Sequence, residues 1–207
     1  ERDWVATANE MNLPPGYPNA ERTVTYDWYH PYRYERIAEV LDAATGVTVE
    51  DCVRLQGDPV NVAARRVIAA LDGFPPGDDL AEPVALLRAW DCAETVGSAA
   101  AALYQLWFRR HLRPAVFRHA LGERADEALA RVLPDDVTSA DVRSDLRLLE
   151  SLRTDPAALH AIIAESLRAA VAEARILLGA DPAGWRWGAL HHAAPAHPMA
   201  GVLTGEW

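Results

Sequence analysis

The segment that follows Asp155 constrains the fold more than any other part of the sequence. Asp155 and Pro156 form a helix start, because an aspartate caps the first free N–H groups and proline fits the first turn. Apolar residues then recur every three or four positions as far as Gly179, and they are Leu159, Ile162, Ile163, Leu167, Ala170, Val171, Ala174 and Leu177. This spacing predicts one long helix whose apolar stripe must pack against other helices.

Apolar residues return at the same spacing in shorter runs between Pro31 and that helix. We expect further helices over 33–44, 48–56, 61–71, 84–90, 94–112, 123–133 and 140–152. Thr48 and Asp51 have the spacing of a capping box, and Pro114 should end or kink the helix over 94–112. Residues 4–8 and 185–190 could be short strands.

The predicted fold class is mainly α. A single, mainly helical region covers residues 1–207, with an irregular stretch over 1–32, helices over 33–180 and a strand or irregular end over 185–207. The irregular stretch is rich in proline, glycine, asparagine and aromatic residues, and turn formers at that density oppose regular structure. An ordered loop with many aromatic residues usually packs against something or lines a site.

The charge balance excludes several classes of partner. The 207 residues carry a formal charge of -10, since 20 arginines are outnumbered by 30 acidic residues. We therefore expect no nucleic acid and no anionic membrane surface as partner. No apolar run reaches the roughly 18–20 residues of a spanning helix. All basic residues are arginine, which excludes a lysine Schiff base or a lysine general base.

The cysteines, the histidines and a cluster of cationic residues could each carry chemistry, but each also has an ordinary structural explanation. Cys52 and Cys92 are expected to be buried thiols within helices rather than a disulfide or a zinc site. His191 and His192 would point to opposite faces of a strand, so no metal is expected at these residues or at His197. The cationic residues between positions 109 and 119 are expected to form a solvated face near a helix C-terminus. No phosphate loop, nucleophile elbow or zinc-protease motif is present.

Several segments resemble one family when they are taken together in order. They are WVATAN at 4–9, HPYRYERIAEVL at 30–41, LQGD at 55–58, WD at 90–91 with GSAA at 97–100, and WGALH at 187–191. In order and spacing they resemble the penicillin acylase family of N-terminal-nucleophile hydrolases. The sequence departs from the family pattern at Glu10, where many members carry a second asparagine, and at Cys92, where glycine is usual.

The resemblance implies an amidohydrolase whose precursor cleaves itself to expose an N-terminal serine. The serine hydroxyl attacks an amide carbonyl while the α-amine of the same residue, which titrates near pH 8, serves as general base. By this resemblance the 207 residues are the helical middle of the large subunit of an α+β, αββα hydrolase, without the serine. The chain alone should then be inactive, and its partners would be the small subunit and the rest of the large subunit.

The same resemblance assigns two catalytic residues. Asn9 matches the family's side-chain donor to the oxyanion, and Arg36 matches an arginine beside the active site that orients the asparagine and the nucleophile. From the residues alone, Asn9 could instead be a turn residue. Arg36 could instead form a salt bridge on the helix surface with Glu35 or Glu39.

The loop over 13–29 would line the acyl pocket, with Tyr26, Trp28 and Tyr29, and with Tyr17, around an apolar chain. The substrate would be a small acyl amide: a β-lactam, an acyl-homoserine lactone or a lipopeptide. No cofactor is expected, although family members often carry a structural calcium; Asp27 is the only acid nearby and is not assigned to it. Members of this family are usually exported, so the resemblance implies that the protein is periplasmic or secreted.

A second reading is a non-catalytic helical module that binds a small apolar ligand or a protein partner. A serine at a self-cleavage junction upstream in the gene would favour the enzyme, and its absence would favour the binding module.

Overall fold

The described part of the chain is helical. The computed structural model describes residues 3–25, 28–127 and 142–193, and these contain no strand, only one isolated bridge between Val60 and Ala93. The α-helices are α1 (Tyr32–Ala43), α2 (Val49–Gln56), α3 (Val62–Ile68), α4 (Ala81–Arg88), α5 (Ala99–Leu106), α6 (Arg113–Leu121), α8 (Val142–Ser151), α9 (Pro156–Leu178) and α10 (Trp187–Leu190). The mainly α prediction is confirmed.

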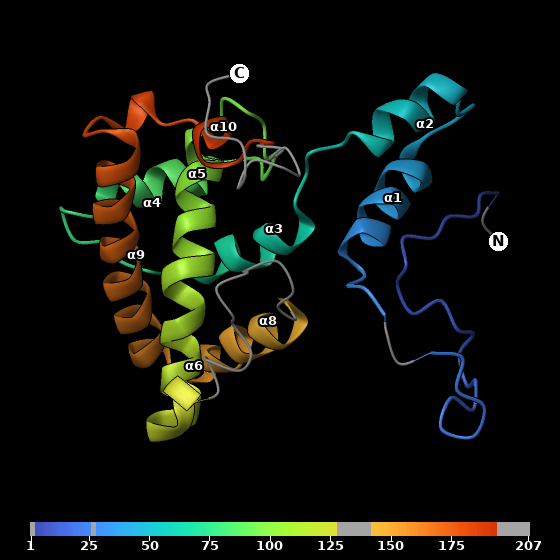
Figure 1. Cartoon of the computed structure of the whole chain (residues 1–207), viewed down its shortest axis with the longest axis horizontal. Helices are drawn as coiled ribbons and strands as arrows, with labels where there is room; N and C mark the ends of the chain where they lie inside the picture. Colours follow the sequence, from blue (N-terminus) through green and yellow to red (C-terminus); the bar gives the residue numbers. More distant parts are fainter. Residues whose placement is uncertain (1–2, 26–27, 128–141, 194–207) are drawn as a thin grey trace, which may run out of the picture.

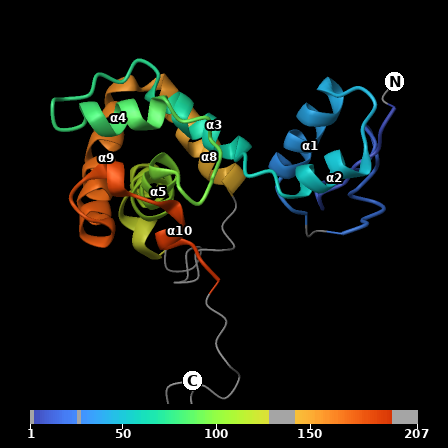
Figure 2. The ribbon, with the colours of Figure 1, turned by 90° about the horizontal axis from the view of Figure 1, so that it is seen from above.

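The helices form two groups in space. The N-terminal segment, α1 and α2 lie on one side, and the helices from α3 onward lie together on the other (Figures 1 and 2). The largest fully buried side chains, among them Trp107, Trp185 and Tyr104, all belong to the second group. Helix α2 buries none of its residues. The hydrophobic core therefore lies in the second group.

A continuous helical rod runs through the core. Helix α5 is capped by Ser98, whose hydroxyl accepts from the Ala101 N–H, and it passes through a π-helical segment (Trp107–Leu112) into α6. The expected helix over 94–112 thus begins later and ends later. Pro114 does not end it, because the wider π turn directly before the proline relieves the clash of its ring with a preceding carbonyl.

Helix α9 packs along this rod as its apolar stripe predicts (Figure 1). The Trp107 indole N–H donates to the Ser166 hydroxyl at 2.9 Å. The Glu173 carboxylate binds Arg110, and it binds His111 at 2.7 Å. The proposed N-cap is confirmed, since the Asp155 carboxylate accepts from the N–H of Ala158, the third residue of α9.

The cationic run within the rod is only in part the expected solvated face. Arg109, Arg118 and His119 are exposed, but Arg113 is only 3% exposed and its guanidinium lies 6.0 Å from the centre of the Phe108 ring. The expectation is wrong for Arg113 because the helix continues to Leu121. This residue therefore sits inside the rod, among packed helices, and not at a frayed end.

Both expected strands are wrong. Residues 4–8 are irregular, and residues 187–190 form the short helix α10 after a 3₁₀ turn at Pro182–Gly184. Trp185 is fully buried, and its indole N–H donates to the Gly179 carbonyl at 2.8 Å. The N–H of Gly188 donates to the Val96 carbonyl at 2.9 Å. A carbonyl of the loop before α5, rather than a neighbouring strand, satisfies this backbone N–H.

Close packing makes Gly188 a sensitive position. A Cβ atom added there would lie 2.6 Å from a side-chain methyl of Val96 and 3.4 Å from its carbonyl oxygen. We expect Gly188→Ala to destabilise the full-length protein by about 1–3 kcal/mol, the usual cost of overpacking. The matched control is Gly184→Ala, where an added Cβ meets nothing within 4 Å. Equal unfolding free energies for the two variants in thermal melts would contradict this packing.

The two thiols differ from the expectation. Both cysteines are free, but Cys52 is exposed on α2 and only Cys92 is buried. Cys92 lies in a loop, with a φ of 63°. This left-handed conformation favours glycine, the residue that is usual at this position in the family pattern. The capping box of Thr48 and Asp51 is present as predicted.

Candidate functional site

Asn9 lies in a strained turn that hydrogen bonds from two backbone N–H groups hold in place. Its φ is 65°, a left-handed value that asparagine tolerates better than most residues. The Ala8 N–H donates to the Glu10 carboxylate at 2.6 Å, and the Tyr29 N–H donates to the Asn9 carbonyl at 2.9 Å. Glu10 is only 6% exposed. The residue that replaces the family's second asparagine therefore fixes this turn.

Arg33, in the first turn of α1, binds this Asn9 turn. Its Nη2 donates to the Ala8 carbonyl at 2.7 Å and to the Asn9 side-chain oxygen at 2.9 Å. The guanidinium carbon also lies 5.5 Å from the centre of the Tyr29 ring, at cation–π distance. Sequence reasoning missed Arg33; the signal available was its place at the start of the helix that follows the aromatic loop.

This contact fixes which end of the Asn9 amide faces outward. A guanidinium carries only donors, so it must meet the amide oxygen and not the NH₂ group. Among the residues that the structure describes, no acceptor binds the Asn9 amide nitrogen. The exposed NH₂ group is therefore available as a donor to another molecule.

Arg36 has other partners than Asn9. Its Nε and Nη2 donate to one oxygen of Asp58 at 3.1 and 2.7 Å, and its Nη1 lies 3.2 Å from Glu39. The surface pair with Glu39 that the sequence allowed is thus present, and the stronger pair with Asp58 was not expected. These contacts hold α1 against the segment that leads into α3.

Further ion pairs join α1 to α3. Glu39 accepts from Arg65 at 2.8 Å, and Glu35 lies 3.6 Å from Arg66. The hydrogen bond from Arg65 holds the pKa of Glu39 below its usual value. Charge pairing therefore connects α1 to α3, in addition to the buried ring of Tyr32, which belongs to the hydrophobic core.

The Arg36–Asp58 pair predicts a pH effect on stability. The hydrogen bond from Arg36 lowers the pKa of Asp58 below its ordinary value of about 3.9. A carboxylate with a depressed folded-state pKa stabilises the fold above its unfolded-state pKa and loses that contribution as pH falls through the folded-state value. We expect Asp58→Asn to cost about 1.5–3 kcal/mol near neutral pH. The difference from wild type should shrink below about pH 4.

Denaturant unfolding of both proteins at several pH values would check this, with the exposed Asp78→Asn as the control for a general charge effect. A difference that stayed constant down to about pH 2 would contradict the assignment.

The aromatic residues proposed for the acyl pocket are only partly placed. Tyr26 lies outside the described residues. Trp28 is half-buried, and its indole N–H is buried without an acceptor among the described residues. Tyr29 is 61% exposed, and Tyr17 is half-buried. Arg33 contacts both the Tyr29 ring and the Asn9 side chain, so it links the two residues. Within the described residues, the rings of Tyr17, Trp28 and Tyr29 do not enclose a pocket.

A groove of about 380 Å³ adjoins Arg33. Its lining includes Arg33, Glu94, Trp187 and His191. The rings of Trp187 and His191 are stacked with centres 4.9 Å apart, and the Glu94 carboxylate accepts from Asn61 at 2.7 Å. Trp187 and His191, from the motif over 187–191, therefore line the same groove as Arg33.

In the described ranges 3–25, 28–127 and 142–193, no three or more His, Cys, Asp or Glu residues lie together as a metal would require. His197 and Asp27 lie outside those ranges, so neither can be placed relative to a metal.

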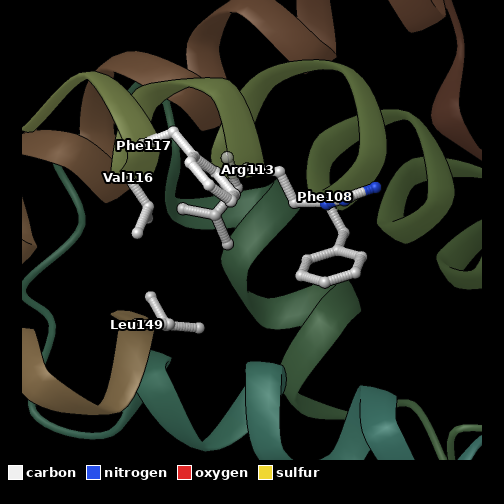
Figure 3. Close-up of a pocket in the computed structure, with 6 residues that line it drawn as sticks. Phe108, Arg113, Val116, Phe117 and Leu149 are labelled. Carbon is white, nitrogen blue, oxygen red and sulfur yellow. The ribbon is translucent and has the colours of Figure 1, made fainter. Parts of the chain in front are cut away.

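A second hollow lies beneath α6 (Figure 3). Val116 and Phe117 face Leu149 across it. Its volume is about 10 Å³, which is the lower limit for a single water molecule. It is a packing defect of the core and not a ligand site.

The comparisons with known proteins agree along the whole chain. The family model for penicillin amidase matches residues 1–206. The acyl-homoserine lactone acylase QuiP of Pseudomonas syringae pv. tomato is 28% identical over 98% of this chain, and that of Pseudomonas putida is 29% identical over 94%. The penicillin acylase 2 proenzyme of Pseudomonas sp. strain SE83 is 27% identical over 95%.

These relatives are much longer than the chain. The aligned part covers 27%, 26% and 25% of them, respectively, so the chain spans about a quarter of their length. Within its described residues, no helix has both the length and the apolar character needed to cross a membrane.

Proposed function

Because the chain belongs to the penicillin amidase family, we propose that it forms part of an enzyme that hydrolyses the amide of an acylated small molecule. The observation that carries the proposal is the Asn9 turn. Its amide oxygen is bound by Arg33, and its NH₂ group is left as a donor on the protein surface.

The reaction is an acyl transfer in two steps. The hydroxyl of an N-terminal serine, supplied by another part of the enzyme, attacks the amide carbonyl and passes its proton to the serine α-amine. The Asn9 NH₂ group donates to the oxyanion that forms on the carbonyl oxygen. Collapse releases the protonated amine and leaves an acyl-serine ester. One water then hydrolyses this ester to a carboxylic acid and restores the serine.

The remaining assignments follow from the same proposal. Arg36 serves the active site by fixing α1 through Asp58, since it does not bond the Asn9 side chain. Tyr26, Trp28 and Tyr29 contact the acyl chain, which is supported by the aromatic rings of Trp28 and Tyr29 in the loop that returns to Asn9. The rest of an αββα hydrolase, including the small subunit, supplies the serine.

An N-acyl-homoserine lactone is the first substrate to test. Two of the relatives described above are named as acylases of these lactones, and one is named as a penicillin acylase. A β-lactam side chain is therefore the second choice. No described feature favours the purely binding module over the enzyme.

The test uses the full-length gene product. We expect mass analysis to show precursor cleavage directly before a serine, and the processed enzyme to release homoserine lactone from N-decanoyl-homoserine lactone. The isolated 207-residue chain should release none, because Asn9 and Arg36 supply neither a nucleophile nor a base. An unprocessed full-length protein that leaves the lactone, phenylacetyl anilide and penicillin G intact would overturn the proposal. Hydrolysis by the isolated chain would overturn the assignment of the nucleophile.

A further inference from the structure

We propose that the apolar face of α2, formed by Val49, Cys52 and Val53, packs against the part of the same enzyme that lies outside these 207 residues. The inference rests on the proposed function in one respect, because that proposal makes the chain one part of a longer enzyme. The occupant of the α2 face is then an apolar surface of the same protein and not a small ligand.

The three residues share one side of α2. Positions 49, 52 and 53 are spaced by three and four residues, which places them on one face of a helix. Val49 is 75% exposed, Val53 is 63% exposed, and Cys52 is exposed as well. The charged residues Glu50 and Arg54 lie on the other side of the helix. An amphipathic helix turns its apolar face toward a core, so the surface that this face should contact is absent from the described residues.

Helix α2 is too short to be stable without tertiary packing. It has 8 residues and buries none of them, whereas isolated helices shorter than roughly 12–15 residues are marginal in water. Its capping box satisfies N–H groups of the first turn only. Packing of the α2 face against another surface would supply the stabilisation that the cap does not.

The surroundings of α2 also lack a core. Met11, Val24 and Val47 are exposed, whereas the largest fully buried side chains all belong to the helices from α3 onward. A groove of about 240 Å³ lies between α1 and α2, and its lining includes the apolar side chains of Val40 and Leu55. In Figure 1, α2 lies far from the core helices α5 and α9. Exposed apolar residues gathered in this way mark a surface that another part of a protein covers.

Size decides between the rest of the enzyme and a second copy of the chain. The 8 residues of α2 span about 12 Å, and a helix is about 10 Å wide, so one face of α2 offers on the order of 100 Å². A stable interface between separate proteins needs about 800 Å² on each partner. A contact within one protein needs far less, because the connecting chain keeps the partner at a high effective concentration. The chain spans about a quarter of the length of the relatives described above, so most of such an enzyme is available to cover α2.

Cys52 lies on the α2 face and can report whether the face is covered. The native full-length gene product is treated with N-ethylmaleimide, and labelling of Cys52 is followed by mass analysis of its peptide. The control is Glu82→Cys, which places a thiol at an exposed position in the first turn of another 8-residue helix, α4. We expect Cys52 to react at least roughly 10-fold more slowly than this control, because a covered thiol reacts only when the contact opens.

Two glutamine variants test the face itself. Val53→Gln places a polar amide in the proposed contact, where it has no assigned partner, and it should speed the labelling of Cys52 toward the rate of the Glu82→Cys control. Glu50→Gln introduces the same residue on the opposite side of α2 and should leave Cys52 protected. If Val53→Gln does not fold, Val53→Ala replaces it, because it weakens the contact without adding a polar group, and it should also speed the labelling.

The outcomes are distinct. Labelling of native Cys52 as fast as that of the control thiol would overturn the proposal, and so would equal protection in the Val53→Gln and Glu50→Gln variants. Protection that is lost on dilution, with a dimeric mass in light scattering, would mean that a second copy covers the face and would also overturn it. Protection that is independent of protein concentration supports the proposal.

The readout does not depend on catalysis. A protected Cys52 in a full-length protein without amidase activity would leave this contact standing while the proposed function fails. A reactive Cys52 in an active enzyme would overturn the contact and leave the proposed function intact.

Discussion

Replacement of Asn9 by glycine is expected to lower kcat of the processed full-length enzyme by roughly 10²–10³, or about 2.7–4 kcal/mol of transition-state stabilisation. Glycine is the appropriate replacement because the φ of 65° is strained for alanine but not for glycine. KM should change little, since the donor acts more strongly on the oxyanion than on the ground-state carbonyl. Folding should be retained, since Asn9 is exposed.

Two comparisons make this experiment specific. Asn9→Asp keeps an oxygen for Arg33 and keeps the left-handed turn, but it replaces the donor with a second acceptor, so it should be at least as inactive. Asn12→Gly alters another exposed asparagine of the same loop and should leave kcat normal. Self-cleavage passes through a similar tetrahedral species, so the rates must be taken on processed enzyme. Normal turnover by Asn9→Gly would reduce Asn9 to a turn residue.

Truncation of Trp185 to alanine is expected to destabilise the protein by about 3–5 kcal/mol, the usual cost of removing a fully buried large aromatic side chain. Trp185 has 0% exposure, and its indole N–H satisfies the Gly179 carbonyl just beyond the end of α9. The alanine variant would therefore leave a cavity and remove the hydrogen bond to Gly179.

Trp187 is the matched control, two residues away. It is partly exposed, lines the same groove as Arg33 and stacks on His191. Trp187→Ala should cost clearly less, about 1 kcal/mol for the lost aromatic pair. Denaturant unfolding of both variants checks the contrast. Comparable losses for the two tryptophans would mean that the end of α9 is not anchored as described.

The prediction of the helical elements succeeded where the determining interactions are local. The starts of α2 and α9 follow from Thr48 and Asp155, each of which bonds an N–H three residues ahead. The apolar stripe of α9 recurs within single turns of the helix, so it can be read without knowledge of what it packs against. The class of fold follows from such patterns.

The prediction failed where the partner of a segment lies far along the chain. By its sequence the segment 185–190 could be a short strand, but the N–H of Gly188 donates to the Val96 carbonyl, and Trp185 fills a space beside the end of α9. Arg113 was expected in solvent because nothing in its neighbourhood shows that the rod continues through the π segment into packed helices. These outcomes depend on which elements become neighbours.

The candidate site shows the same division. The motif around Asn9 and the helix that carries Arg33 and Arg36 could be recognised from the sequence, since each is a short segment with its own pattern. The sequence could not show which arginine reaches Asn9. Arg33 and Arg36 lie one turn apart on the same helix, 24 and 27 positions from Asn9, so both are possible partners. The direction in which the chain returns over the 10–31 loop decides that choice, and this direction is a property of the tertiary structure. The sequence by itself determined the helices, their caps and the asparagine. Only tertiary contacts decided that Arg33 holds the amide while Arg36 binds Asp58, because a hydrogen bond requires its donor and acceptor to lie within about 3 Å in space.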